Sequence, residues 1–353
     1  MADHSAIEWT DATWNPITGC SIVSPGCVHC YAMKLAGTRL KHIESRKGLT
    51  RETAIGPVWT GEVRLNEKWL DQPLRWKQPR RIFVCAHGDL FAENVPDDWI
   101  DRVFAIMALA PQHTFQVLTK RAKRMREYLT QRDAGQRLRA DAVEVAGWNM
   151  VMQGQIGHAK PTIWPLPNVW LGVSAERQKE ADDRVPELLA TPAAIRFISA
   201  EPLLGRIDFG KIIRAATFAG TTYPDGKTHP IGWMIVGGES GPGARPMHPN
   251  WVRQIRDDFT AAGVPFFFKQ WGAWWPQECN PLPQQRFAER LRTARITPSI
   301  EKPLRGCWGV DDKWDPGKIA GALPAYTSWK IGKKAAGRLL DGVEHSEFPK
   351  VAA

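Results

Sequence analysis

Residues 82–120 read IFVCAHGDLFAENVPDDWIDRVFAIMALAPQHTFQVLTK, and this stretch predicts a strand, a helix and a second strand. Its two ends, Ile82–Cys85 and Phe115–Leu118, are short β-branched and aromatic runs of the kind found in buried strands. Between them, Asp97–Ala110 follows a proline and places its apolar residues on one stripe, as expected of an amphipathic helix. Such a unit predicts two parallel strands joined by a right-handed crossover.

The same pattern recurs along the chain. Further apolar runs lie at Val169–Val173, Ile195–Ser199, Trp233–Val236 and Val264–Phe268, with a shorter one near Thr13–Gly19. None of the long runs alternates polar and apolar residues, which is typical of strands buried on both faces of a parallel sheet. A second helix is predicted over Asn250–Ala262. We therefore expect an α/β fold built as a partial or closed (β/α) barrel, with a doubly wound open sheet as the alternative.

Two segments interrupt this pattern. Residues 130–168 are polar and then rich in proline, and residues 275–326 are rich in Pro, Gly and Arg without periodicity. We interpret both as irregular insertions, which are common places for function. The expected organisation is a barrel core over residues 1–275, with a cysteine loop at 20–30 and an insertion at about 130–168. An irregular C-terminal extension over residues 276–353 is expected to pack on that barrel.

Length and composition limit the class of protein. A chain of 353 residues with 43% hydrophobic and 24% charged residues is neither disordered, nor collagen-like, nor a small disulfide scaffold. No apolar stretch approaches the roughly 20 residues that cross a bilayer, and the N-terminus lacks a secretory signal layout, so a cytoplasmic protein without a membrane role is expected. The net charge of +10 and the 17 tryptophans suit a nucleic-acid partner, although solubility and core packing are competing explanations.

Polar residues follow almost every predicted strand. Because the carboxyl ends of parallel strands share one edge, where chemistry gathers, these residues are candidate cofactor-binding groups. They are Gly88, Asp89, Lys120, Ser174, Glu176, Glu201 and Glu239. Each alone serves equally well as a helix cap, and it is their recurrence that favours a site. The basic run KRAKRMR at 120–126 begins at this edge, so we expect Lys120 or Arg121 to reach a carboxylate or a phosphate.

Three cysteines lie close together in the segment GCSIVSPGCVHCY, residues 19–31; they are Cys20, Cys27 and Cys30. Without a secretory signal, such spacing indicates a metal or redox site rather than disulfides. A structural zinc site would need a fourth ligand from His29, His87 or Cys85. Three thiolates without an evident fourth ligand favour a [4Fe–4S] cluster with one open iron. Both interpretations remain open from the residues alone.

Several stretches of the chain resemble the phage-associated three-Cys-motif family, a family catalogued as a domain of unknown function and regarded as radical-SAM-like. The matching stretches are Ile7–Tyr31, Phe115–Arg121, Trp170–Ser174, Phe197–Leu204, Ile235–Gly241, Phe267–Gly272 and Lys333–Leu340. They are spread over nearly the whole chain outside the two insertions. The resemblance implies a barrel of the radical S-adenosylmethionine type, with the cysteine loop after the first strand and the cofactor across the strand ends.

The resemblance also implies a reaction. The three cysteines would hold three irons of a [4Fe–4S] cluster, and S-adenosylmethionine would chelate the fourth and yield a 5′-deoxyadenosyl radical. Gly88 and Asp89 match the place of the contact to the methionine amino group, and Ser174 and Glu176 match the place of ribose contacts. The candidates for returning a hydrogen atom to a product radical are Cys85 and Tyr31.

The expected substrate is large, with nucleic acid as the preferred class, and the implied protein partner is a co-encoded phage protein. From a different class comes the alternative function, a zinc-stabilised nucleic-acid-binding phage protein without turnover. In that alternative the same cysteines hold a structural ion and the basic and aromatic residues bind the polyanion. The two functions differ in one measurable property, which is whether the purified protein holds iron or zinc.

Overall fold

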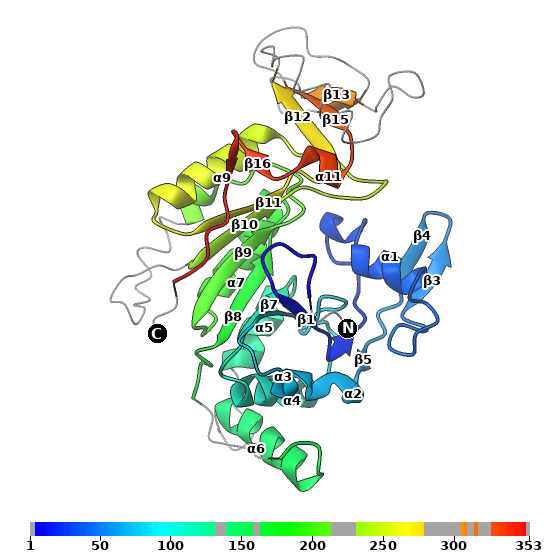
Figure 1. Cartoon of the computed structure of the whole chain (residues 1–353), viewed down its shortest axis with the longest axis vertical. Helices are drawn as coiled ribbons and strands as arrows, with labels where there is room; N and C mark the ends of the chain where they lie inside the picture. The colour runs from blue at the N-terminus through cyan, green and yellow to red at the C-terminus, as the bar shows by residue number, and fades with distance from the viewer. Residues whose placement is uncertain are drawn as a thin grey trace. The chain divides into compact units, whose positions relative to one another are not determined.

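A seven-stranded parallel half-barrel organises the chain, as the computed structural model in Figure 1 shows. The strand order is β1-β6-β7-β8-β9-β10-β11, so every strand is added on the same side as the one before. This singly wound order confirms the partial barrel; the doubly wound alternative is wrong because the order never reverses. The strands are β1 (Ala12–Trp14), β6 (Arg81–Val84), β7 (Thr114–Thr119), β8 (Val169–Ser174), β9 (Ile195–Ala200), β10 (Trp233–Gly237) and β11 (Phe266–Gln270).

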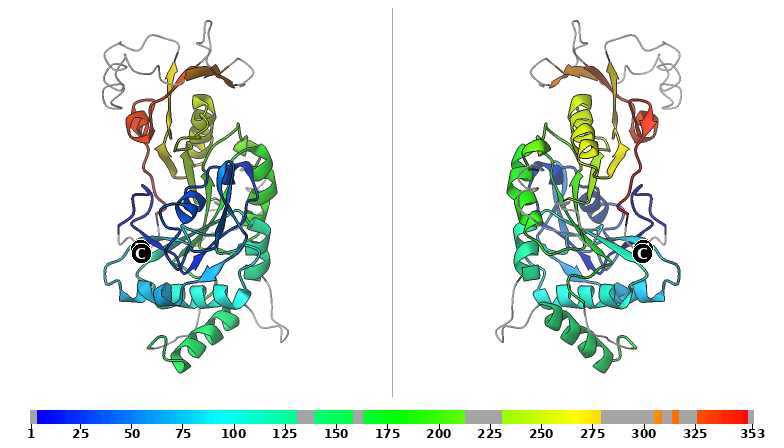
Figure 2. Two further views of the ribbon diagram at one scale, coloured as in Figure 1. Left: turned by 90° about the vertical axis from the view of Figure 1, so that its right-hand side faces the viewer. Right: turned by 90° about the vertical axis from the view of Figure 1, so that its left-hand side faces the viewer.

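The structure describes residues 4–130, 139–157, 163–212, 231–278, 305–308, 314–316 and 326–350. The longer helices are α4 (Asp97–Leu109), α5 (Ala122–Thr130), α6 (Arg139–Met152), α7 (Gln178–Leu189) and α9 (Pro249–Ala261). The shorter ones are α1 (Tyr31–Gly37), α2 (Glu67–Leu70), α3 (Gln72–Arg75), α11 (Lys333–Ala336) and the single 3-10 turn η1 (Pro25–Cys27). Figure 2 gives two side views of these elements.

Short strands pair in four further sheets. The two-stranded ones are β2 (Ile17–Thr18) with β5 (Arg64–Leu65), β3 (Thr50–Thr53) with β4 (Gly56–Trp59), and β16 (Leu339–Leu340) with β17 (Val343–Glu344). The four-stranded antiparallel sheet has the order β12 (Trp274–Glu278), β15 (Tyr326–Lys330), β13 (Arg305–Trp308), β14 (Trp314–Pro316).

The predicted strands and helices are found with small shifts. All residues of β8 and β10 are buried, which explains why their sequences do not alternate. The last strand begins two residues later than predicted, so Lys269 lies inside β11 rather than after it. The first predicted strand is split at Pro16, which cannot donate a ladder hydrogen bond: β1 joins the barrel sheet and β2 pairs with β5.

The two segments expected to be irregular contain regular structure. Residues 139–152 form α6, whose Val143 and Met150 are buried although its apolar residues do not follow one stripe. Residues 274–330 contribute the four-stranded antiparallel sheet. The sequence of this segment shows no clear periodicity, so the local pattern does not indicate its strands. Residues 131–138, 158–162 and most of 279–325 lie outside the described residues.

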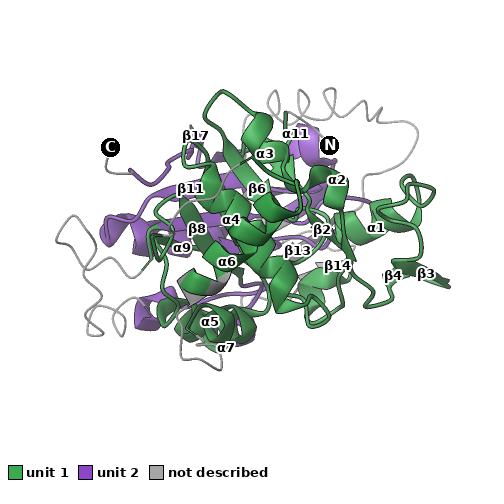
Figure 3. Ribbon diagram, turned by 90° about the horizontal axis from the view of Figure 1, so that it is seen from below, with its two compact units in different colours: residues 1–174, 182–198, 230–232 green, residues 175–181, 199–229, 233–353 purple. Residues whose placement is uncertain are grey.

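Two units are distinguished by their internal contacts, as Figure 3 shows. The first comprises residues 1–174, 182–198 and 230–232, and the second comprises residues 175–181, 199–229 and 233–353. In the second unit, residues near the C-terminus lie along β10 and β11, where Trp233 Nε1 donates to the carbonyl of Glu347 over 2.8 Å. No helix in the described part of the chain has the length and apolar character needed to cross a membrane.

Candidate functional site

The cysteine loop leaves the carboxyl edge of the half-barrel directly after β2. Gly19 begins it with a φ of +99°, and a Cβ at this position would lie 2.1 Å from the carbonyl oxygen of Glu62. Only glycine therefore fits here. The loop then turns through η1, which Ser24 precedes, and Cys30 precedes α1. All three cysteines of the motif thus lie between one short strand and one short helix.

Helix α1 and the β3–β4 hairpin fix the far end of this loop. Their buried side chains form one apolar cluster of Ala32, Met33, Ala36, Leu49 and Trp59, and both Cys20 and Cys30 pack against it. Gly37 lets the helix approach the hairpin, because a Cβ there would lie 2.1 Å from Cβ of Pro57. The first and last cysteines of the motif are therefore held against the same hydrophobic surface.

The thiols of the three motif cysteines are free and lie close enough to influence one another electrostatically. Burial, together with the negative charge of Asp89, raises the pKa of Cys20 to about 12. Burial also raises the pKa of Cys30. Both thiols are therefore protonated at neutral pH in the metal-free chain. A metal ion that binds them would have to displace these protons.

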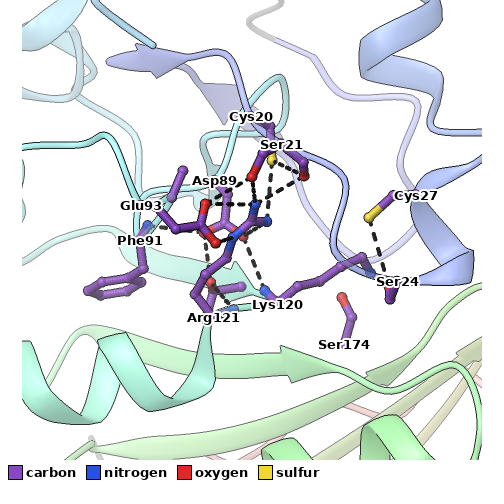
Figure 4. A network of polar contacts seen from close by, with 12 residues as sticks. Cys20, Ser21, Ser24, Cys27, Asp89, Phe91, Glu93, Lys120, Arg121 and Ser174 are labelled. Carbon is purple, nitrogen blue, oxygen red and sulfur yellow. Dashed lines mark hydrogen bonds and ion pairs between the residues drawn. The ribbon is translucent and has the colours of Figure 1, made fainter. Parts of the chain in front are cut away.

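The three sulfur atoms do not converge on one point. Among the residues that the structure describes, no three His, Cys, Asp or Glu side chains are grouped to hold a metal ion. Each of two thiols has its own partner instead: Cys20 Sγ accepts from Arg121 Nη1 over 3.4 Å, and Cys27 Sγ lies 3.8 Å from Ser24 Oγ (Figure 4). The donor chemistry fits a cluster, while the expected gathering of the sulfurs is not found in these protonated thiols.

A buried arginine ties the cysteine loop to the strand ends. The side chain of Arg121 is 5% exposed, and its guanidinium contacts Asp89 at 3.2 Å and Glu93 at 3.1 Å. The same guanidinium donates to the carbonyl of Ser21 over 3.0 Å and to Cys20 Sγ (Figure 4). Burial alone would lower the pKa of Arg121, but the two carboxylates outweigh burial and raise it, so the group stays charged. The prediction that a basic residue at this edge reaches a carboxylate is confirmed.

Lys120, the residue before Arg121, acts on the other end of the motif. Its positive charge counteracts the effect of burial on the pKa of Cys30, and Figure 4 shows its side chain extending toward Ser24. Two consecutive residues after β7 therefore place positive charge beside different motif cysteines. Such cations stabilise the thiolate forms of those cysteines, which are the metal-binding forms.

Asp89 has a structural explanation. Its carboxylate is 6% exposed and accepts four hydrogen bonds, all from the chain itself. The donors are Thr119 Oγ1 at 2.7 Å, the amides of Phe91 and Lys120 at 3.0 and 3.1 Å, and Arg121 Nη1 at 3.2 Å. These four bonds fix the Asp89 carboxylate at the rim, beside the cysteine loop.

The neighbouring candidates lie close to the loop. A Cβ on Gly88 would lie 3.0 Å from the carbonyl oxygen of Gly19, so the glycine permits the bridge between these two residues. Cys85 is buried in the left-handed region, with a φ of +57°, and burial raises the pKa of its thiol to about 12. The phenol of Tyr31 donates to the carbonyl of Ala86 over 2.6 Å while half of the residue is exposed.

Ser174 belongs to the first unit, and the three predicted glutamates belong to the second. Ser174 is buried at the end of β8, and its carbonyl accepts from Arg184 over 2.8 Å. Glu176 is fully buried. Glu201 accepts from Ser199 Oγ and pairs with Lys269 at 3.1 Å, and a Cβ on Gly237 would collide with its carboxylate.

Glu239 also has a partner in the second unit. Its carboxylate pairs with Arg245, which donates through Nε and Nη2 over 2.9 and 2.6 Å. The amide of Arg245 adds a third bond over 2.9 Å. This pair closes the turn of residues 239–245, so the glutamate has a structural use in the segment GGESG, where the sequence offered only its position after a strand.

One family model matches residues 4–349, and its description is Protein of unknown function (DUF5131). The chain belongs to this family. No curated protein and no solved structure matches the chain. The DUF5131 model spans the half-barrel, the cysteine loop and the C-terminal sheet, so these parts occur together in one family.

In this DUF5131 protein the sequence patterns indicate the cysteines but not their surroundings. Two further residues complete the Arg121 network, Glu93 and Ser21. The sequence does not indicate either of them, because Glu93 follows a strand end by several residues and Ser21 lies in a loop. Arg121 is distinguished from the other basic residues of its run only by burial. The local charge pattern, read together with the strand ends, is the one signal that points to it.

Proposed function

We propose that this protein is an iron–sulfur enzyme of the radical S-adenosylmethionine type, acting on a large substrate. One observation carries the proposal: three free thiols on a loop at the carboxyl edge of a parallel half-barrel are flanked by Lys120 and Arg121 from a single strand end. The chemistry at such an edge is built from loops that follow the strands. A structural zinc site would need a fourth ligand, which the three-cysteine motif itself does not supply.

The charges suit an anionic cluster. Three thiolates and a [4Fe–4S] core carry net negative charge, and buried cations beside the sulfurs offset the cost of that charge. Cys20, Cys27 and Cys30 would hold three irons. With the fourth iron open, the group supplies one-electron reduction of a bound sulfonium cofactor.

The chain's own residues position and protect this site. Arg121 donates hydrogen bonds to Cys20 Sγ and to the carbonyl of Ser21, and so fixes the orientation of the first thiol of the motif at the rim. Cys85 keeps its proton on Sγ because burial raises its pKa to about 12, and a protonated thiol is the form that can give up a hydrogen atom. Exposed apolar side chains on and beside the loop would be covered by a large substrate; they are Ile22, Val23, Val28 and Tyr31.

Anaerobic reconstitution with iron and sulfide, followed by dithionite and S-adenosylmethionine, tests the proposal. We expect a brown protein that forms 5′-deoxyadenosine, and we expect Cys30→Ala to form none. Cys85→Ala is the matched control, because a buried cysteine outside the motif should not be needed for cofactor cleavage. A colourless protein with one zinc per chain would support the binding-protein alternative and contradict the proposal. A loaded cluster that yields no deoxyadenosine would contradict the cofactor assignment alone.

A further inference from the structure

Arg46 is a buried arginine without an acidic partner. Its residue is 6% exposed, and among the described residues no carboxylate pairs with its guanidinium. Nη1 donates to Ser45 Oγ, the guanidinium carbon lies 5.6 Å from the centre of the Trp69 ring, and Nε is buried without a partner. A buried charge is costly unless it is paired with an opposite charge, and no carboxylate in the described part of the chain provides that pairing for Arg46.

His87 lies within the electrostatic range of Arg46 and also has an unused polar atom. Its Nδ1 is buried without a hydrogen-bond partner. Burial and the charge of Arg46 lower the pKa of His87 to about 4, so the ring is neutral at pH 7 and can donate or accept one hydrogen bond there. Its main chain is fixed, because the amide donates to Asn15 Oδ1 over 2.9 Å.

The backbone around Arg46 is held in place by buried hydrogen bonds. Thr18 Oγ1 donates to the carbonyl of Ser45 over 2.7 Å, and Asn66 Nδ2 donates to the carbonyl of Asn15 over 3.0 Å. The main chain of Ser45, the residue before Arg46, is therefore held beside β2. β2 leads directly into the cysteine loop. His87, which lies within the electrostatic range of Arg46, precedes Gly88, and Gly88 bridges to Gly19 at the start of that loop.

The surface around this point is basic. Residues 34–51 contain six Lys and Arg residues and one Glu. Apart from the buried Arg46, these basic residues are exposed in α1, in β3 or on the segment between them; they are Lys34, Arg39, Lys41, Lys47 and Arg51. One buried guanidinium within a basic surface matches a polyanion that inserts one charged group and lays its neighbours along the outside.

We propose that Arg46 and His87 bind one backbone phosphate of a nucleic-acid substrate, with the exposed basic residues of 34–51 contacting the adjacent phosphates. The phosphate would accept from Arg46 Nε and from His87 Nδ1, two of the buried polar atoms that have no hydrogen-bond partner in the described part of the chain. Arginine suits this role because its planar fork matches phosphate geometry. The inference names the substrate class of the proposed enzyme, and in that respect it rests on the proposed function.

Calorimetric titration of the full-length, iron-free protein with inorganic phosphate tests the pocket. We expect saturable binding that Arg46→Met weakens by at least about tenfold, the factor that about 1.4 kcal/mol represents. Arg75→Met is the matched control, since Arg75 is an exposed arginine paired with Asp71, and its affinity should stay within about twofold of the parent. Arg46→Met should also raise the Tm of the ligand-free protein, because it removes an unpaired buried charge.

Equal phosphate affinity in the parent and Arg46→Met would overturn the pocket, as would a parent protein that binds no phosphate. If Arg46→Met does not fold, Arg46→Lys replaces it: the charge remains, the fork is lost, and weaker phosphate binding is still expected. These titrations need no iron. If the protein binds phosphate through Arg46 but stays colourless after anaerobic reconstitution, the proposed function is refuted and the pocket is not. A brown, active protein without phosphate binding refutes only the pocket.

A single-stranded oligothymidylate of about 20 nucleotides, longer than the stretch one binding domain covers, tests the polymer. The logarithm of its affinity should fall linearly with the logarithm of the salt concentration. The steepness of this line reflects the number of phosphates contacted, so Arg46→Met should reduce it by the amount that corresponds to about one phosphate contact. Polyglutamate is the competing polyanion. Equal binding of polyglutamate and oligothymidylate would contradict nucleic acid as the substrate class.

Discussion

Arg121 is the residue on which the rim depends most. Replacing it by methionine leaves the buried carboxylate of Asp89 without its charge partner, although three other donors remain. We expect Arg121→Met to lower the free energy of unfolding by about 3 kcal/mol, measured by urea denaturation. Arg75→Met, which breaks the exposed pair with Asp71, should cost less than about 1 kcal/mol. Similar small losses of unfolding free energy in both variants would show that Arg121 contributes no more to stability than an exposed arginine.

His87 makes stability depend on pH. Its pKa is about 4 in the folded chain and 6.5 ordinarily, because burial disfavours the charged ring. Between these values the unfolded chain binds the proton and the folded chain does not, so the free energy of unfolding falls as the pH is lowered from 6.5 to 4. The full loss is about 3 kcal/mol at 1.36 kcal/mol per pKa unit. Urea denaturation of His87→Gln over the same range should lack this component, and an unchanged slope would contradict the assignment.

Some residues of the candidate site can be predicted from the sequence and others cannot. The spacing of Cys20, Cys27 and Cys30 indicates a shared site, and the position after β7 indicates Lys120 and Arg121. Arg46 gives no such signal, because its run of basic residues reads as a solvated surface and only the fold buries one member. The partners that saturate Asp89 and Glu239 are also invisible in the sequence, since whether a carboxylate is free or paired depends on packing.

Among the elements, the contact of α1 with the β3–β4 hairpin controls the cysteine loop. Gly37→Ala should gain up to about 1 kcal/mol of helix propensity, yet its Cβ would lie 2.1 Å from Pro57. We expect a net loss of about 1–3 kcal/mol in urea denaturation, because the hairpin has to move. Gly157→Ala is the matched control, since nothing lies within 4 Å of a Cβ there. Equal stability of the two variants would mean that α1 and the hairpin are not tightly packed.

Elements with a clear local pattern are predictable from the sequence, and elements without one are not. The strands β6 to β11 and helices α4 and α9 are continuous apolar runs and amphipathic stripes, which local sequence specifies. Helix α6 lacks a single apolar stripe, and the strands β12 to β15 lie in a part of the sequence without clear periodicity. Pro16 divides the first strand, and its two halves join different sheets.

At the scale of the whole molecule, the half-barrel brings the cysteine loop and the ends of β6 and β7 together at one edge, although they are far apart in sequence. The net charge of +10 is concentrated in part on residues 34–51, beside that loop. The sequence predicts the parallel architecture because strand and helix patterns alternate along it. It does not predict the open rim of the sheet, since closure depends on whether the first and last strands pair.

Counting iron tests the central claim most directly. After anaerobic reconstitution, the parent protein and Cys85→Ala should each hold about four irons and as many sulfides per chain. Cys20→Ala, Cys27→Ala and Cys30→Ala should each hold far less, because each removes one of the three thiols that bind the cluster. Equal iron in all five proteins, or none in the parent, would contradict the claim that these cysteines hold an iron–sulfur cluster.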